Sequence, residues 1–210
     1  YAGYALAGTL AYILAGMTPF DAVNHTFAGI STGGFSTRPE SIGYWNSVPV
    51  EAVTIVLMIL GNLNFLTAYV LFRGRFAAFA RNGEVRAFTF VVALGSVLVF
   101  FLVAPELYGH IGKCARVAVF ETVSALTTTG FGTVPYVPWN SAGYLILTIL
   151  MLIGGGTGST AGGLKQLRLY LLYKAFVWEV RRALLPRNTV IEYPVWLGEQ
   201  KFFVSDALVR

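Results

Sequence analysis

Long apolar runs separated by short polar segments dominate the chain. Four of these runs contain no charged residue, and each meets the length of roughly 20 residues that a helix needs to cross a bilayer. They cover residues 1–20, 52–72, 87–105 and 122–164. The pattern predicts several membrane-spanning helices. No basic n-region followed by an apolar core and a cleavage site marks the first run as a signal peptide.

The second half of the chain repeats the first. A shift of 96 residues aligns residues 22–39 with residues 118–135, with identity at 8 of 18 positions. After small slips in register, YWNS at residues 44–47 matches PWNS at residues 138–141. Because a repeat fixes the architecture, the sequence predicts two tandem units of the same fold.

Each unit consists of a long apolar helix, a short amphiphilic helix, a polar heptad and a second long apolar helix. The short helices, of 12 to 14 residues, cannot span a bilayer, which predicts re-entrant pore helices in an all-α membrane protein. In the first unit, residues 1–72, these segments are 1–18, 19–30, 31–37 and 50–72. In the second unit, residues 86–180, they are 86–107, 113–126, 127–133 and 141–180. A cytoplasmic connector at 73–85 and a cytoplasmic linker at 181–210, leading to a following repeat, complete the chain.

The two heptads, STGGFST and TTTGFGT, are polar and helix-breaking inside apolar surroundings. At membrane depth each unsatisfied backbone group costs several kcal/mol, so irregular backbone survives only inside protein or beside water. Threonine favours extended backbone, and glycine permits dihedrals closed to other residues. Such strands can aim carbonyls at a cation and replace its hydration shell. The competing interpretation is a pair of ordinary surface turns, but their repetition in the same setting favours a filter.

These motifs resemble those of the Trk/Ktr/HKT superfamily of potassium and sodium transporters, in particular its TrkH-type membrane subunits. The similar segments are DAVNHTFAGISTGGFSTRPESIGYW, FETVSALTTTGFGTVPYVPWNSAGYLILTILMLIGGGTGSTAGGLK and the tail PRNTVIEYPVWLGEQKFFVSDALVR. Members of this superfamily carry four helix, pore-loop, helix repeats around one ion path, with one filter glycine in each. The resemblance implies that Gly34 and Gly130 are two of these glycines. It also implies that the chain is a fragment holding the second and third repeats.

The function implied by the resemblance is transport of potassium, with sodium as a second candidate ion, through a carbonyl-lined selectivity filter. No cofactor is expected in this chain, and K⁺ or Na⁺ is the transported ion. The resemblance further implies a multi-pass protein of the cell (inner) membrane, a homodimer, and a cytosolic ring of nucleotide-binding regulatory subunits as partner. The predicted filter residues are Ser31, Thr32, Gly33, Gly34, Phe35, Thr127, Thr128, Thr129, Gly130 and Phe131.

The closing segments of the two units differ in glycine content. Residues 61–68 contain one glycine and residues 154–163 contain six, each costing a helix about 1 kcal/mol relative to alanine. The closing helix of the second unit is therefore predicted to break in mid-membrane, while that of the first unit continues. GxxxG helix packing through Gly158 and Gly162 is the competing explanation. In the resembling family this position holds the loop that gates conduction, and Lys165 is expected to help hold it shut by its charge. The predicted gate residues are Gly154, Gly155, Gly156, Thr157, Gly158, Ser159, Thr160, Ala161, Gly162, Gly163 and Lys165.

The basic residues indicate the orientation in the membrane. The predicted connector holds three arginines against one glutamate and is followed directly by Arg86, and six further lysines and arginines follow Gly163 before residue 188. Both regions are predicted on the cytoplasmic side, since cytoplasmic loops are enriched in lysine and arginine. The net charge of +5 therefore reflects topology, and no nucleic-acid partner is expected. Cys114 is the only cysteine, which excludes an intrachain disulfide.

Several polar residues inside the apolar segments have two explanations each. His25 and Glu121 occupy equivalent positions in the two pore helices, where each either braces its filter strand or faces an outer vestibule. Asp21 is expected to cap the first pore helix, whose first turn favours an acid. Asn62 and Asn64 are expected to face a water-filled path or to bond a neighbouring helix.

Two functions other than transport remain open from the sequence. An intramembrane enzyme would use Ser31, Ser124 or Ser159, with His25 or His110 within hydrogen-bond reach. A helix-bundle membrane scaffold would tolerate serine in place of both filter glycines, whereas a filter would lose selectivity or conduction. Neither paired carboxylates nor a cluster of metal ligands indicates covalent chemistry in the sequence.

Overall fold

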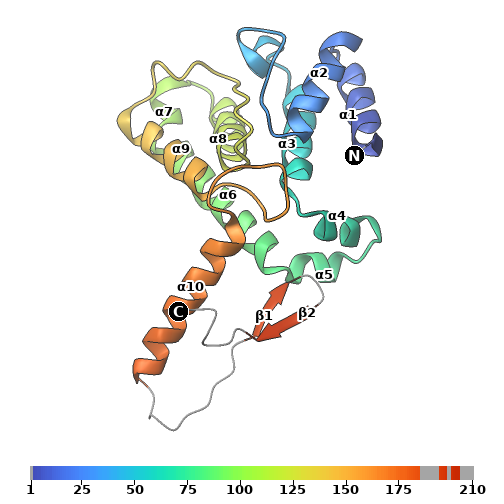
Figure 1. Cartoon of the computed structure of the whole chain (residues 1–210). Helices are drawn as coiled ribbons and strands as arrows, with labels where there is room; N and C mark the ends of the chain where they lie inside the picture. Colours follow the sequence, from blue (N-terminus) through green and yellow to red (C-terminus); the bar gives the residue numbers. More distant parts are fainter. Residues whose placement is uncertain (1, 185–193, 198–199, 204–210) are drawn as a thin grey trace.

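Two groups of three helices, one for each sequence repeat, form the body of the protein (Figure 1). The computed structural model describes residues 2–184, 194–197 and 200–203. The first group contains α1 (Ala2–Leu14), α2 (Pro19–Ile30) and α3 (Val48–Asn62), and the second contains α6 (Gly83–Leu102), α8 (Ile111–Leu126) and α9 (Ser141–Ile153). The other elements are η1 (Ser41–Tyr44), α4 (Phe65–Phe72), α5 (Phe76–Arg81), α7 (Ala104–Leu107), α10 (Gln166–Leu184), β1 (Pro194–Leu197) and β2 (Gln200–Phe203). The all-α fold class is confirmed, with one antiparallel strand pair as an addition among the described residues.

A glycine marks the point where the three helices of each group cross. A Cβ on Gly8 of α1 would lie 2.9 Å from a methyl of Thr26 on α2 and 2.8 Å from the side chain of Leu57 on α3. Gly95 of α6 meets the equivalent threonine and leucine on α8 and α9, at 2.8 and 3.3 Å. The two repeats therefore share a packing point, at which the outer helix approaches too closely for any side chain.

Replacing Gly95 by valine should destabilise the second helix group. The valine side chain would overlap the threonine that faces Gly95, and overpacking of this kind costs about 1–3 kcal/mol. We expect a lower thermal unfolding temperature of the full-length protein in detergent, followed by tryptophan fluorescence. The matched control is Gly3→Val, since a Cβ on Gly3 meets nothing within 4 Å. Equal stability of the two variants would contradict the crossing point.

The two helix groups pack against each other mainly through α3 and α8. Ile59 of α3 and Val92 of α6 lie against both apolar cores. Arg116 of α8 donates a hydrogen bond from Nε to Glu51 of α3 at 2.9 Å, and a second bond from its terminal nitrogen. Because Glu51 is buried, the arginine compensates a charge that would otherwise be costly to bury. This ion pair fixes the register of one repeat against the other.

The closing helix of the first repeat ends earlier than its low glycine content predicted. The structure contradicts a continuous helix over 50–72. α3 ends at Asn62, and α4 starts at Phe65 after a break of two residues. The carbonyl oxygen of Gly61 accepts a hydrogen bond from the hydroxyl of Thr160 at 3.1 Å. A side chain from a distant loop thus bonds the last turn of α3, an interaction that helix propensity does not reveal.

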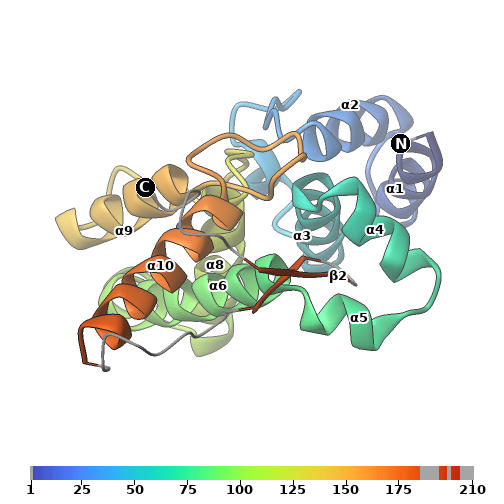
Figure 2. The ribbon, with the colours of Figure 1, turned by 60° about the horizontal axis from the view of Figure 1, so that its bottom comes forward.

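α4, α5, α10 and the strand pair lie on one side of the helix groups, and the loops after the pore helices lie on the other (Figures 1 and 2). The region predicted as a connector at 73–85 contains α5 and the start of α6. α6 begins at Gly83 because the side chain of Asn82 accepts a hydrogen bond from the amide of Glu84 at 2.9 Å, as N-cap residues do. Most of the linker predicted at 181–210 lies outside the described residues.

The described residues include one helix, α6 with 20 residues, that is both long and apolar enough to cross a membrane. Three further helices are apolar but have only 13 to 15 residues. These are α1, α3 and α9.

Candidate functional site

The two pore helices, α2 and α8, end in the same unusual way. In each, the two residues after the C-cap donate backbone hydrogen bonds to the last helical turn at 2.8–3.1 Å, which is a Schellman motif. The left-handed residue of this motif is usually glycine, but here it is Thr32 (φ 52°) after α2 and Thr128 (φ 54°) after α8. This conformation costs an L-residue roughly 1–2 kcal/mol. Strain of this kind is concentrated at functional sites.

A glycine with positive φ follows two residues later in both strands. Gly34 has a φ of 67° and Gly130 a φ of 84°. A Cβ on Gly34 would overlap the carbonyl oxygen of Thr129 in the other strand. The non-helical segments 31–37 and 127–133 therefore meet near these glycines, although they are far apart in the sequence.

The phenylalanine after each glycine has a different environment in the two repeats. Phe131 is completely buried and stacks on His25 of α2, with ring centroids 5.7 Å apart. Its carbonyl oxygen accepts a hydrogen bond from Ser124 of α8 at 2.6 Å. Phe35, the equivalent residue of the first repeat, is 81% exposed. The second strand is thus packed by the repeat that precedes it in the chain.

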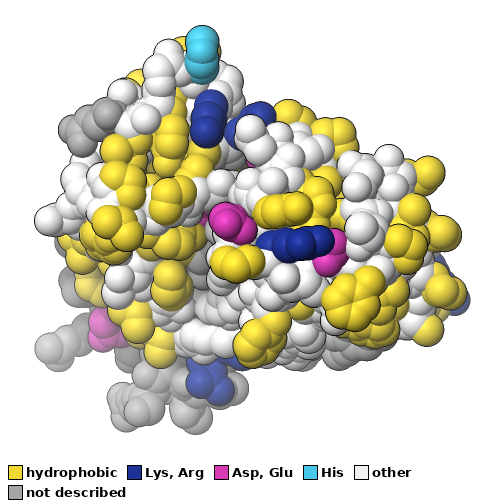
Figure 3. Space-filling model, turned by 90° about the horizontal axis from the view of Figure 1, so that it is seen from above, with side chains coloured by type: hydrophobic (Ala, Val, Ile, Leu, Met, Phe, Trp, Pro, Cys, Tyr) yellow, Lys and Arg dark blue, Asp and Glu magenta, His cyan; other side chains and the backbone are white. Residues whose placement is uncertain are grey.

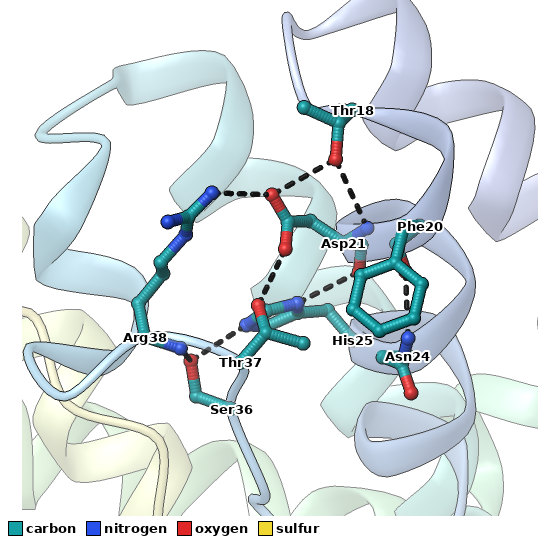
Figure 4. Close-up of polar contacts among 8 residues, drawn as sticks. All are labelled: Thr18, Phe20, Asp21, Asn24, His25, Ser36, Thr37 and Arg38. Atoms are coloured by element: carbon teal, nitrogen blue, oxygen red, sulfur yellow. Dashed lines mark hydrogen bonds and ion pairs between the residues drawn. The ribbon is translucent and has the colours of Figure 1, made fainter.

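A buried carboxylate braces the outer end of the first strand (Figure 4). Asp21 accepts hydrogen bonds from the hydroxyl of Thr37 at 2.5 Å and from Arg38 at 3.2 Å. Thr18, rather than Asp21, is the N-cap of α2 and accepts a bond from the amide of Asp21 at 3.2 Å. Asp21 lies in the first turn, as predicted, and supports the cap, because its carboxylate accepts from the hydroxyl of Thr18 at 2.9 Å as well as from the strand.

His25 ties the middle of α2 to the same strand (Figure 4). Its Nδ1 lies 2.8 Å from the carbonyl oxygen of Asp21, and its Nε2 lies 2.8 Å from Oγ of Ser36. Because a carbonyl only accepts, Nδ1 carries the proton and Nε2 accepts from the serine hydroxyl. Ser36 Oγ also accepts from the amide of Arg38 at 3.1 Å. The histidine braces the strand, which is one of the two roles the sequence indicated.

Glu121 has the equivalent role behind the second strand. Its Oε1 accepts hydrogen bonds from the amide and the hydroxyl of Thr133, at 2.8 and 2.7 Å. Its Oε2 accepts from the hydroxyl of Tyr136. The side chain of Glu121 is fully buried, so it does not face an outer vestibule. The equivalent buried residues of the two helices, His25 and Glu121, are therefore each bonded to the strand of their own repeat.

The serines considered for an enzyme do not use their hydroxyls on a histidine. The hydroxyls of Ser31, Ser124 and Ser159 each donate to a main-chain carbonyl. His110 is exposed at the start of α8. None of the three serines named by the enzyme interpretation therefore bonds a histidine in the structure. His25 bonds Ser36 instead, whose oxygen also accepts from the amide of Arg38 and so belongs to the brace of the first strand.

Residues 154–163, between α9 and α10, form an irregular segment that we call the glycine loop. Its two limbs lie against each other, and the amide of Gly155 donates to the carbonyl of Gly162 at 3.1 Å. A Cβ on Gly154 or Gly163 would overlap backbone of the opposite limb. Helix packing through GxxxG is excluded, because neither glycine of that motif lies in a helix.

Three side chains from other elements hold the glycine loop. Asn62 at the end of α3 accepts a hydrogen bond from the amide of Gly156 at 2.9 Å. Glu84 at the start of α6 accepts from the next amide of the loop, and Gln166 donates to the carbonyl of the first loop residue at 2.9 Å. Asn64 lies beside the same loop. Sequence reasoning missed Glu84 and Gln166; the signal for Glu84 was a lone acid at the start of an apolar helix.

The face that carries the loops after the pore helices is mostly apolar or uncharged. Figure 3 shows a few acidic and basic side chains there, set among hydrophobic ones. No group of three or more histidine, cysteine, aspartate or glutamate side chains that could hold a metal ion occurs among the described residues. The strands themselves offer main-chain carbonyls and threonine hydroxyls, the hard oxygen ligands that alkali cations bind.

Sequence comparison places this arrangement in a known family. The family profile of TrkH, described as a cation transport protein, matches residues 4–208. The chain belongs to the TrkH family. As a TrkH-family chain it is a membrane protein.

Its relatives are named as transporters, and none of those compared here is named as an enzyme. The chain is 36% identical to the Trk system potassium uptake protein TrkH of Vibrio parahaemolyticus over 198 residues, which are 89% of the chain and 39% of that relative. It is 36% identical to TrkH of Escherichia coli (strain K12) over 205 residues, which are 93% of the chain and 40% of that relative. The crystal structure of the potassium transporter TrkH from Vibrio parahaemolyticus matches with a TM-score of 0.81 and 34% identity, over 95% of this chain and 43% of that one. The chain thus spans 39–40% of the length of these curated relatives.

Proposed function

We propose that the chain forms part of a pore that passes K⁺ through the membrane, with residues 31–35 and 127–131 as two sides of its selectivity filter. The supporting observation is that both strands have the same backbone conformation. In each, a left-handed threonine is followed two residues later by a glycine with positive φ. Backbone that alternates between left- and right-handed φ turns successive N–H groups to one side, which leaves the carbonyl oxygens on the other side. A row of carbonyl oxygens aligned in this way can replace the hydration shell of a potassium ion.

A complete filter needs more repeats than these two. Phe131 is buried because it stacks on the pore helix of the preceding repeat, whereas Phe35 is 81% exposed. We expect Phe35 to pack in the same way against the pore helix of a repeat that precedes it in the full-length protein. The longer relatives have room for such repeats, since the chain spans only 39–40% of their length.

Potassium is favoured over sodium as the transported ion. Both proposed filter positions hold glycine, at Gly34 and Gly130, and the relatives at 36% identity are named potassium uptake proteins. Sodium remains a second candidate. The chain itself supplies the oxygen atoms, so no cofactor enters this function.

The glycine loop is proposed to gate the pore. It lies between the two helix groups in Figure 1, and its amides bond to Asn62 from one repeat and Glu84 from the other. The loop has no regular secondary structure, so its conformation depends on contacts with its neighbours. Loss of the bond to Asn62 or Glu84 would loosen the limb at Gly156 and Thr157 without unfolding a helix, while the opposite limb keeps its own contacts.

Replacing Lys165 by alanine should raise K⁺ flux. The Lys165 ammonium donates a hydrogen bond to the carbonyl of Ala161 inside the glycine loop, and its charge opposes a cation in the path. A hydrogen bond from a charged group contributes about 1.5–3 kcal/mol, so we expect a flux increase of roughly tenfold or more in proteoliposomes. Lys174→Ala is the control, because Lys174 is an exposed lysine on α10. Unchanged flux in Lys165→Ala would remove this residue from gating.

The proposed location is the cell (inner) membrane, crossed several times by the full-length protein. α10, which holds four arginines and lysines, and the segment 73–81 around α5, which holds three arginines, lie on the same side of the helix groups (Figure 2). This arrangement supports a cytoplasmic placement of that side. α10 is a basic amphiphilic helix that starts two residues after the glycine loop. We propose cytosolic nucleotide-binding subunits as the partners that move it, and a homodimer as the assembly.

Potassium uptake tests this function directly. The full-length parent protein, expressed in a bacterium that lacks its own potassium uptake, should restore growth at low external K⁺. Rescue by K⁺ but not by Na⁺ would identify the ion. Failure to restore growth, with the protein present in the membrane, would contradict the proposed function.

A further inference from the structure

The two left-handed threonines contact the glycine loop directly. Thr128 Oγ1 accepts a hydrogen bond from the amide of Gly162 at 2.6 Å. Thr32 Oγ1 lies within hydrogen-bond distance of Thr160 Oγ1, at 3.2 Å. Each strand is therefore bonded to the loop at the residue where it leaves its pore helix. Glycine, the usual residue in this conformation, has no side chain to make such a bond.

Thr160 stands where three elements meet. Its hydroxyl lies 3.0 Å from the carbonyl oxygen of Ile30, the last residue of α2, and 3.1 Å from that of Gly61 in α3. The Thr32 hydroxyl has one proton, which can go to the carbonyl oxygen of Ser31 at 2.7 Å or to Thr160 at 3.2 Å. Because Thr160 donates its own proton to one of the two carbonyls, its oxygen can accept from Thr32. One hydroxyl of the loop thus lies within hydrogen-bond distance of the end of α2, the end of α3 and the first strand.

These contacts have a consequence for ion selectivity, which rests on the proposed pore function. We propose that Thr160 and Thr128 are positioning residues through which the glycine loop sets the geometry of the filter, so that the filter discriminates fully between K⁺ and Na⁺ only while the loop is docked. The physical reason is that Thr32 and Thr128 hold a disfavoured conformation, which persists only when its surroundings impose it. When the loop leaves, each threonine loses a bond that holds this conformation, and the carbonyls of its strand turn with it.

The contact to Asn62 provides a comparison inside the same loop. Asn62 bonds the limb at Gly156, which lies opposite the limb whose Gly162 bonds Thr128. A variant at Asn62 therefore loosens the loop from the side that does not touch the filter. If the coupling runs through Thr160 and Thr128, the two kinds of variant must differ in selectivity.

The experiment measures the K⁺/Na⁺ permeability ratio and the K⁺ flux of the purified full-length protein in liposomes. Thr160→Val keeps the shape and removes the hydroxyl, and we expect it to lower the permeability ratio by about fivefold or more, the lower bound of typical coupling between sites. Thr128→Val should act in the same direction, which gives a second variant if the first does not fold. Asn62→Ala should raise flux with an unchanged permeability ratio. Thr148→Val, which removes an exposed hydroxyl on α9, should change neither.

A double variant distinguishes a direct contact from general loosening. If Thr32 and Thr160 act through their mutual bond, Thr32→Val combined with Thr160→Val should lower the permeability ratio no further than the larger single effect. Wild-type flux together with an unaltered ratio in Thr160→Val and Thr128→Val would overturn the coupling and leave the pore function standing. An equal fall of the ratio in Asn62→Ala would also overturn it. Absence of K⁺ flux through the wild-type protein would instead overturn the proposed function itself.

Discussion

Replacing Gly34 by serine should abolish selective K⁺ passage through the full-length protein. The φ of Gly34 is 67° and a Cβ there would overlap the carbonyl oxygen of Thr129. The serine variant must therefore move backbone in both strands, and the oxygen displaced is one that we assign to the ion path. We expect a fall of at least about tenfold in the K⁺/Na⁺ permeability ratio, which corresponds to roughly 1.4 kcal/mol of lost discrimination, or complete loss of K⁺ uptake.

Gly130→Ser provides a graded comparison. Gly130 also has a positive φ, of 84°, but a Cβ there meets nothing within 4 Å. Only the cost of the left-handed conformation remains, roughly 1–2 kcal/mol, so selectivity should fall less than in Gly34→Ser. Gly109→Ser is the neutral control, since Gly109 has open space and no positive φ. A protein that tolerates both filter variants is a scaffold, and the pore assignment would then be wrong.

Replacing Glu121 by alanine should prevent stable assembly of the second repeat. Three hydrogen bonds converge on its buried carboxylate, two from Thr133 and one from Tyr136. The variant leaves the amide of Thr133 without a partner inside an apolar region, and each hydrogen bond to a charged group contributes about 1.5–3 kcal/mol. We expect a loss of several kcal/mol of stability and no K⁺ uptake, measured by thermal unfolding and by growth at low K⁺.

Smaller changes around Glu121 separate the carboxylate from its partners. Tyr136→Phe and Thr133→Val each remove one hydroxyl and keep the hydrogen bond from the amide of residue 133 to Glu121. Each variant should therefore lose only part of the stability that is lost in Glu121→Ala. Glu40→Ala, at an exposed glutamate on the same side of the molecule, should leave stability unchanged. If Glu121→Ala is as stable as Glu40→Ala, the brace has no structural role.

The sequence predicted those features that depend on local chemistry and on the repeat. α2 begins after Thr18, has proline in its first turn and ends where the polar heptad begins, and each of these signals is local. The irregular glycine loop follows from glycine content for the same reason. The alignment of the repeats showed that His25 and Glu121 are equivalent positions. In the structure each side chain bonds the strand of its own repeat.

The features that sequence reasoning missed depend on contacts between distant segments. α3 ends at Asn62 because it bonds a loop almost 100 residues later, and no property of its own residues indicates this. Glu84 was read as one charge of a basic connector, whereas it bonds the glycine loop. Asp21 was assigned to the helix end nearest to it, because a short-range explanation was available. Contacts of this kind become visible only when the chain is folded.

The stacking of Phe131 on His25 gives assembly of the two repeats a direction. The helix that receives Phe131 belongs to a segment synthesised earlier, so His25 leaves the ribosome before Phe131 does. Because N-terminal parts of a chain generally fold first, the second repeat can pack onto a first repeat that is already formed.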